Sequence, residues 1–121
     1  GECAGPLSSK DLGALGKEKR PGNVLCPATG KRVATGAVLG GSGGDFLRQA
    51  KEAGADALVT GEAGHHDGLD ALEMGITLVA AGHFATEWPV VPALAERLTE
   101  HFPGAEVLVS SASRDPFTAL A

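Results

Sequence analysis

The sequence has no tyrosine, and aromatic residues make up only 4% of its 121 residues. No apolar run reaches the roughly 18 residues that a membrane helix needs, so we expect no transmembrane segment. The chain also does not open with a charged and then apolar signal segment. Its two cysteines, Cys3 and Cys26, are too few for a disulfide scaffold. These absences predict a protein of a reducing, cytoplasmic compartment.

Basic residues are scarce as well. The chain has 10 Lys and Arg residues against 15 Asp and Glu residues, a formal net charge of −5, which argues against nucleic-acid binding. The hydrophobic share of 43% and the charged share of 21% are ordinary for a globular domain. A chain of this length corresponds to one domain, so we treat residues 1–121 as a single α/β unit.

Acidic residues and histidines are concentrated in one stretch. Between Asp56 and Glu87 the chain has six acidic residues and three histidines, and it has no Lys or Arg there. Such a stretch favours cations. A solvated acidic face is the alternative interpretation.

Apolar strand-like segments alternate with helical ones along the chain. This order predicts an α/β fold with a mixed, mostly parallel sheet and helices packed on it, after an irregular or helical lead-in over residues 1–32. Ligand sites in such sheets lie at the carboxyl ends of the strands. We predict strands at 24–26, 31–39, 57–60, 76–81 and 106–110, and helices over 10–20, 45–53, 67–74 and from the Pro89 region to about 102.

Three loops follow predicted strands and are expected at one edge of the sheet. The first, Gly40–Gly44, could present backbone N–H groups to an anion, with Asp45 capping the next helix. It lacks the lysine of a phosphate-binding P-loop and does not match G-x-G-x-x-G. A tight strand-to-helix turn is the alternative.

The second loop is rich in groups that could bind a metal or transfer protons. Glu62, His65, His66 and Asp67 are all candidates for these roles. The alternative is a polar loop in which His66 or Asp67 caps the following helix. On these residues alone, both interpretations stay open.

The third loop contains His83 and Glu87, which are four residues apart. On a helix they would share one face within reach of one metal ion. A surface hydrogen bond between them is the alternative, because a tight site uses three or four protein ligands. Trp88 is expected to be a packing or interface residue, and His101 a structural one near a helix end.

Three runs resemble the Nif-three-like (NGG-interacting factor three) family, whose bacterial members are often named GTP cyclohydrolase type 2 homologues. The same order and spacing occur there for Gly41-Ser42-Gly43-Gly44-Asp45-Phe46, for Thr60-Gly61-Glu62 followed by His66-Asp67, and for Gly82-His83-Phe84-Ala85-Thr86-Glu87. The resemblance covers nearly the whole chain but only the C-terminal half of a typical member. It implies one half of a two-half α/β architecture, with a further domain encoded upstream.

The resemblance also implies a dinuclear metal centre whose ligands come from both halves. By the match, His83 and Glu87 are metal ligands, His66 is a catalytic acid–base residue, and Glu62 and His65 line the site. Glu62 stands where the family usually has Asp. The family's own His-His pair, near its start, is missing here.

The implied function is metal-dependent hydrolysis of a nucleotide-like small molecule by a homo-oligomer. Zn, Fe, Mn and Ni all suit histidine and carboxylate ligands, and the sequence does not choose among them. One alternative is a non-catalytic metal-binding oligomeric scaffold or partner-binding module. Another is a plain phosphate-binding domain that uses Gly40–Gly44.

Overall fold

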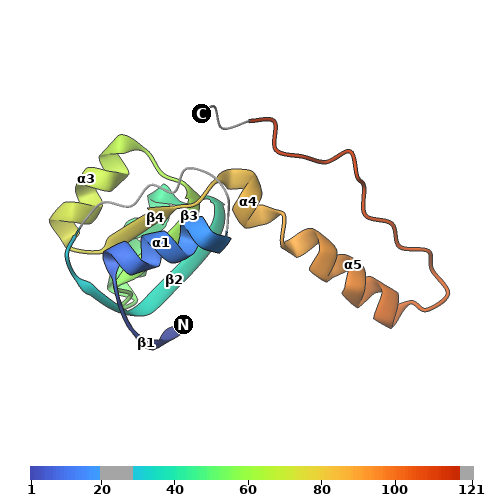
Figure 1. Cartoon of the computed structure of the whole chain (residues 1–121), viewed down its shortest axis with the longest axis horizontal. Coiled ribbons are helices and arrows are strands. Elements are labelled where there is room, and N and C mark those ends of the chain that lie inside the picture. Colours follow the sequence, from blue (N-terminus) through green and yellow to red (C-terminus); the bar gives the residue numbers. More distant parts are fainter. Residues whose placement is uncertain (20–28, 118–121) are drawn as a thin grey trace.

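A four-stranded sheet with the strand order β1-β2-β3-β4 forms the centre of the fold (Figure 1). The structure is a computed structural model, and it describes residues 1–19 and 29–117. One strand pair is antiparallel and two are parallel, so the predicted mixed, mostly parallel sheet is confirmed. The strands are β1 (Glu2–Ser8), antiparallel to β2 (Arg32–Ser42), and then β3 (Ala57–Glu62) and β4 (Thr77–Ala80), each parallel to the strand before it.

Helices connect the strands and pack on the sheet. Helix α1 contacts β1, β2 and β4, whereas α4 contacts the two central strands β2 and β3. Helix α5 extends away from the sheet, and an extended segment follows it (Figure 1). None of the helices within residues 1–19 and 29–117 has the length and hydrophobicity of a membrane span. The helices are α1 (Ser9–Lys19), the 3₁₀ helix η1 (Gly44–Phe46), α2 (Leu47–Glu52), α3 (His65–Met74), α4 (His83–Glu87) and α5 (Val90–His101).

The N-terminal segment is more regular than the predicted lead-in. The helix expected at 10–20 is present as α1, and Ser8 caps it by accepting the Asp11 N–H at 3.1 Å. The strand β1 before it was not predicted, because Gly5 and Pro6 are poor strand formers; an edge strand tolerates them. The predicted strand at 24–26, with Cys26, lies outside the described residues.

The main core lies between the sheet and helices α2 and α3. Leu58 and Leu78 on neighbouring parallel strands pack against Leu47, Ala50, Ala55, Ala71 and Ile76. Leu69 and Leu72 of α3 lie three residues apart, a spacing typical of a core-facing helix stripe, but their side chains are 50% and 47% exposed. The small side chain of Ala71 faces the core instead and is fully buried, which allows close approach of the helix.

The predicted last strand at 106–110 is also wrong. Its apolar, β-branched sequence is typical of a strand, but a strand also needs a neighbour that offers backbone hydrogen bonds. In the described part of the chain no strand pairs with this segment, and Leu108 is 79% exposed. The helix predicted from the Pro89 region to about residue 102 is confirmed as α5, with Pro89 directly before it. Helix α4 lies in the segment that was predicted as the third loop.

Candidate functional site

The carboxyl ends of β2, β3 and β4 meet at one edge of the sheet, as predicted. The backbone pairing between β3 and β4 continues beyond β4, because Ala81 N–H donates to the Thr60 carbonyl and Gly82 N–H to the Gly61 carbonyl, both at 2.8 Å. Glu62 follows Gly61 at the end of β3, and His83 follows Gly82 after β4, so the two residues lie side by side. This pairing brings two of the predicted site residues together.

His83 lies between two carboxylates. Its Nδ1 is 3.2 Å from Oε2 of Glu62, and its Nε2 is 3.2 Å from Oε2 of Glu87. The hydrogen bond to Glu62, followed by the negative charge of Glu87, raises the pKa of His83 above its usual 6.5. All three side chains are about half exposed, so a ligand can reach them from solvent.

Helix α4 presents His83 and Glu87 on one face, as their spacing predicts. The Thr86 hydroxyl links this short helix to the sheet, because it accepts the Gly41 N–H of β2 at 3.1 Å. The same hydroxyl can donate to the Gly82 carbonyl, which is 3.0 Å away. Sequence reasoning assigned Thr86 no role of its own. The only signal for it is its place within the run from Gly82 to Glu87.

Two glycines allow α4 to lie this close to the sheet. A Cβ on Gly61 would be 2.6 Å from both the Gly41 carbonyl oxygen and Thr86 Oγ1. A Cβ on Gly41 would be 2.5 Å from the Glu87 carboxylate, and Gly41 has a φ of +72°, which disfavours other residues. The glycine run at 40–44 predicts an anion-binding loop or a tight turn, and neither prediction includes this packing of Gly41 against α4.

The structure does not favour the anion-binding interpretation of Gly40–Gly44. Gly40 to Ser42 belong to β2, which is longer than the predicted 31–39. The Gly41 N–H is bonded to Thr86, and the Gly43 N–H is bonded to the Glu62 carbonyl at 3.3 Å. The prediction that Asp45 caps a helix is also wrong, because Asp45 lies inside η1, which has no side-chain cap.

His65 and His66 form the start of α3, which begins two residues earlier than predicted. Their rings meet edge-on, with centroids 5.7 Å apart. Asp67 accepts the Gly64 N–H at 2.6 Å, so the helix-cap interpretation is confirmed for Asp67. Among the residues that the structure describes, no group of three or more His, Cys, Asp or Glu side chains has the arrangement of a metal site, so these histidines do not complete one around His83.

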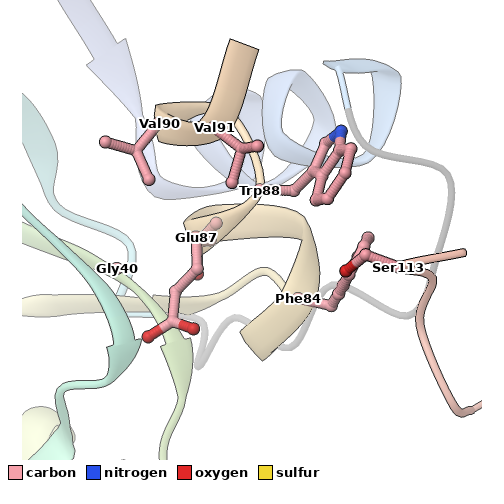
Figure 2. A pocket seen from close by; sticks show the side chains of 8 residues that line it. Gly40, Phe84, Glu87, Trp88, Val90, Val91 and Ser113 are labelled. Carbon is pink, nitrogen blue, oxygen red and sulfur yellow. The ribbon is translucent and has the colours of Figure 1, made fainter. Parts of the chain in front are cut away.

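Each carboxylate beside His83 also lines a pocket. Glu87 lines one of about 580 Å³ together with Phe84 and Trp88, whose rings stack at 5.2 Å (Figure 2). This stacking confirms the packing role predicted for Trp88. Glu62 lines a second pocket of about 400 Å³ with Asp45 and Asp67. One pocket is bordered by aromatic rings and the other by carboxylates, and the imidazole of His83 contacts one carboxylate from each.

These features define an α/β protein with a histidine–carboxylate cluster at the carboxyl edge of a mixed sheet. The profile of the Duf34/NIF3 (NGG1p interacting factor 3) family matches residues 3–116. The chain therefore belongs to this family, and the resemblance found in the sequence is confirmed.

Several relatives support this assignment. The chain is 35% identical over 131 aligned residues to a GTP cyclohydrolase 1 type 2 homolog of Streptomyces coelicolor, covering 98% of this chain and 45% of that protein. It is 40% identical over 82 residues to the homolog of that name in Clostridium perfringens, covering 67% of this chain and 31% of the relative. A crystal structure of a Staphylococcus aureus protein superposes with a TM-score of 0.87 at 29% identity, covering 98% of this chain and 41% of the other. The chain thus spans less than half the length of these relatives.

Proposed function

We propose that this chain binds a divalent metal ion through Nε2 of His83 and the carboxylate of Glu87. The observation that carries the proposal is the convergence of these two donors on one face of α4, with Nε2 and Oε2 only 3.2 Å apart. An imidazole and a carboxylate suit zinc, iron, manganese or nickel. The donor chemistry therefore fits a transition metal. Because both side chains are about half exposed, a metal ion can reach them from solvent.

Two ligands are fewer than the three or four that a tight site uses. Because the chain spans less than half of its relatives, we propose that further ligands come from outside it, as in the dinuclear centre that the family resemblance implies. A second copy of the chain in a homo-oligomer is one source of such ligands. Glu62 and His65 remain proposed site-lining residues, and the cytoplasm remains the proposed compartment.

The reaction that we propose for the complete site is hydrolysis of a nucleotide-like small molecule, in line with the names of the relatives. A bound divalent metal would supply a water molecule acidic enough to act as a nucleophile near neutral pH. His83 binds a metal through Nε2 only as a neutral ring with its lone pair on Nε2, and Glu87 only as a carboxylate, so metal binding would release any proton on Nε2 to solvent. His66 remains the proposed acid–base residue on the strength of the family resemblance.

Equilibrium dialysis against a fixed zinc concentration tests the binding proposal. We expect the wild-type chain to bind more zinc at equilibrium than His83→Ala and Glu87→Gln, which each lack one of the two proposed ligands. His101→Ala is the matched control, because His101 lies on α5 and, within residues 1–19 and 29–117, its side chain is hydrogen-bonded only to the backbone carbonyl of Arg97, at 3.1 Å. Equal zinc in wild type and His83→Ala would contradict the proposal.

A second candidate function is a non-catalytic metal-binding scaffold or partner-binding module. The observation in its favour is helix α5, which has no buried residue and exposes apolar side chains such as Val90 at 63% and Leu94 at 54%. Bound metal without turnover of any nucleotide tested would favour the scaffold. Turnover that is lost in His83→Ala while the fold is kept would favour the hydrolase.

A further inference from the structure

We propose that Glu62 is the positioning residue of this site: it accepts the Nδ1–H of His83 and so directs Nε2, on the other side of the ring, toward the metal. The inference rests on the proposed function and adds to it a residue that is not itself a ligand. Its basis is the 3.2 Å contact between Oε2 of Glu62 and Nδ1 of His83. Histidines that bind metals generally donate their other ring N–H to a carboxylate, a carbonyl or water.

The backbone of Glu62 is well placed for this role. Glu62 is the last residue of β3 and pairs with Ser42 of β2. Its carbonyl accepts the Gly43 N–H at 3.3 Å, so its main chain is fixed by β2. The carboxylate therefore extends from the sheet, whereas both proposed metal ligands extend from α4.

This difference between the elements determines what each carboxylate can do. Glu87 and His83 are on the same helix and move with it, so their contact does not orient that helix relative to the sheet. Glu62 reaches His83 from β3, and its contact fixes the ring relative to the rest of the molecule. With the proton kept on Nδ1 by Glu62, the lone pair of Nε2 is available on the side of Glu87.

A purely electrostatic role is the competing explanation, because any carboxylate near the site attracts cations. Two substitutions separate the roles. Glu62→Gln removes the charge but keeps an oxygen that can accept the Nδ1–H, whereas Glu62→Ala removes both. Asp45→Ala is the matched control, because Asp45 lines the same pocket as Glu62 but makes no hydrogen bond or ion pair to His83 in the described structure.

Zinc affinity of the full chain, measured by isothermal titration calorimetry, gives the first result. We expect Glu62→Ala to weaken zinc binding about 10- to 100-fold, which is typical for the loss of such a partner. The loss of zinc affinity should be clearly smaller in Glu62→Gln, and the zinc affinity of Asp45→Ala should equal that of the wild type. Equal losses in Glu62→Gln and Glu62→Ala, or a comparable loss in Asp45→Ala, would overturn the positioning role. The Glu62 side chain is 55% exposed, so the variants should fold, and far-UV circular dichroism checks this.

Long-range ¹H–¹⁵N spectra of the metal-free chain, recorded where the His83 ring is neutral, give a second result that needs no metal. We expect a smaller share of the Nδ1–H tautomer in Glu62→Ala than in wild type, since Glu87 at Nε2 is then the remaining carboxylate partner. An unchanged tautomer ratio would overturn the inference even if zinc binds. No zinc binding by the wild type would instead overturn the proposed function and the metal part of this inference, while the tautomer ratio still tests whether Glu62 orients the ring.

Discussion

The backbone of Gly41 lies directly against the carboxylate of Glu87. A Cβ on Gly41 would stand 2.5 Å from Oε1 of Glu87 and 3.4 Å from Nε2 of His83. Gly41 also has a φ of +72°, at a point where the register between β2 and β3 shifts. The end of β2 is thus shaped to receive the side chains of α4, so the site and the sheet depend on each other.

Gly41→Ala should both destabilise the protein and displace Glu87. A non-glycine residue at positive φ costs about 1–3 kcal/mol of the free energy of unfolding. We expect a loss of this size in urea denaturation, together with weaker zinc binding.

Gly36→Ala is the control for this substitution. Gly36 lies in the same strand, has no positive φ, and a Cβ there would meet no atom within 4 Å. A stability loss as large in Gly36→Ala as in Gly41→Ala would contradict the explanation.

Thr86→Val should loosen α4 from the sheet while keeping the shape of the side chain. The substitution removes the oxygen that accepts the Gly41 N–H, and an unsatisfied donor costs about 1–3 kcal/mol. Trp88, the single tryptophan, lies at the end of α4, so its fluorescence reports the unfolding of this region.

Thr99→Val is the matched control for Thr86. In the part of the chain that the structure describes, its hydroxyl donates only to the Ala95 carbonyl of its own exposed helix α5, at 2.9 Å. We expect a change in the free energy of unfolding within about 0.5 kcal/mol, as is usual for surface positions. Equal effects of the two substitutions would show that Thr86 does not link α4 to β2.

His83 should make the stability of the metal-free chain depend on pH. Its folded pKa is raised above 6.5, chiefly by the hydrogen bond to Glu62, so the folded state holds the proton more tightly than the unfolded state. The stabilisation is then fully present below the unfolded pKa and is lost as the pH rises through the folded pKa. The free energy of unfolding, measured from mildly acidic to mildly alkaline pH, should show this loss in wild type but not in His83→Gln. A parallel pH profile in both proteins would refute the assignment.

Asp56 should contribute stability with the opposite pH dependence. Its carboxylate accepts the N–H groups of Ala34 and Thr35, both at 3.0 Å, and these bonds lower its pKa below 3.8. The stabilisation is present above the unfolded pKa and is lost as the pH falls through the folded pKa. Asp56→Asn should therefore destabilise the protein most at neutral pH, with a smaller difference from wild type in acid.

Acid titration of the free energy of unfolding measures this effect. Asp70→Asn is the control, because Asp70 is an exposed residue of α3 with no hydrogen bond or ion pair found among the described residues. A pH profile of Asp56→Asn that coincides with wild type would rule out this role for Asp56.

Local sequence patterns predicted the contacts that depend on a short stretch of chain. The four-residue spacing of His83 and Glu87 places them on one face of any helix, and the structure has them in contact. The hydrogen bond by which Asp67 caps α3 likewise depends on neighbouring residues. By contrast, the segment at 106–110 has a strand-like sequence, but strand formation depends on a partner that the sequence pattern cannot supply.

Hydrophobic patterning along the chain is enough to predict the alternation of strands and helices, with acidic and histidine residues after three strand ends. The contact between Glu62 and Nδ1 of His83, and the space that Gly41 and Gly61 leave for α4, depend instead on how the elements pack. The physical reason is that hydrophobic periodicity acts along the chain, whereas these contacts join residues about twenty or more positions apart. They exist because the parallel pairing of β2, β3 and β4 brings the three strand ends to one edge of the sheet.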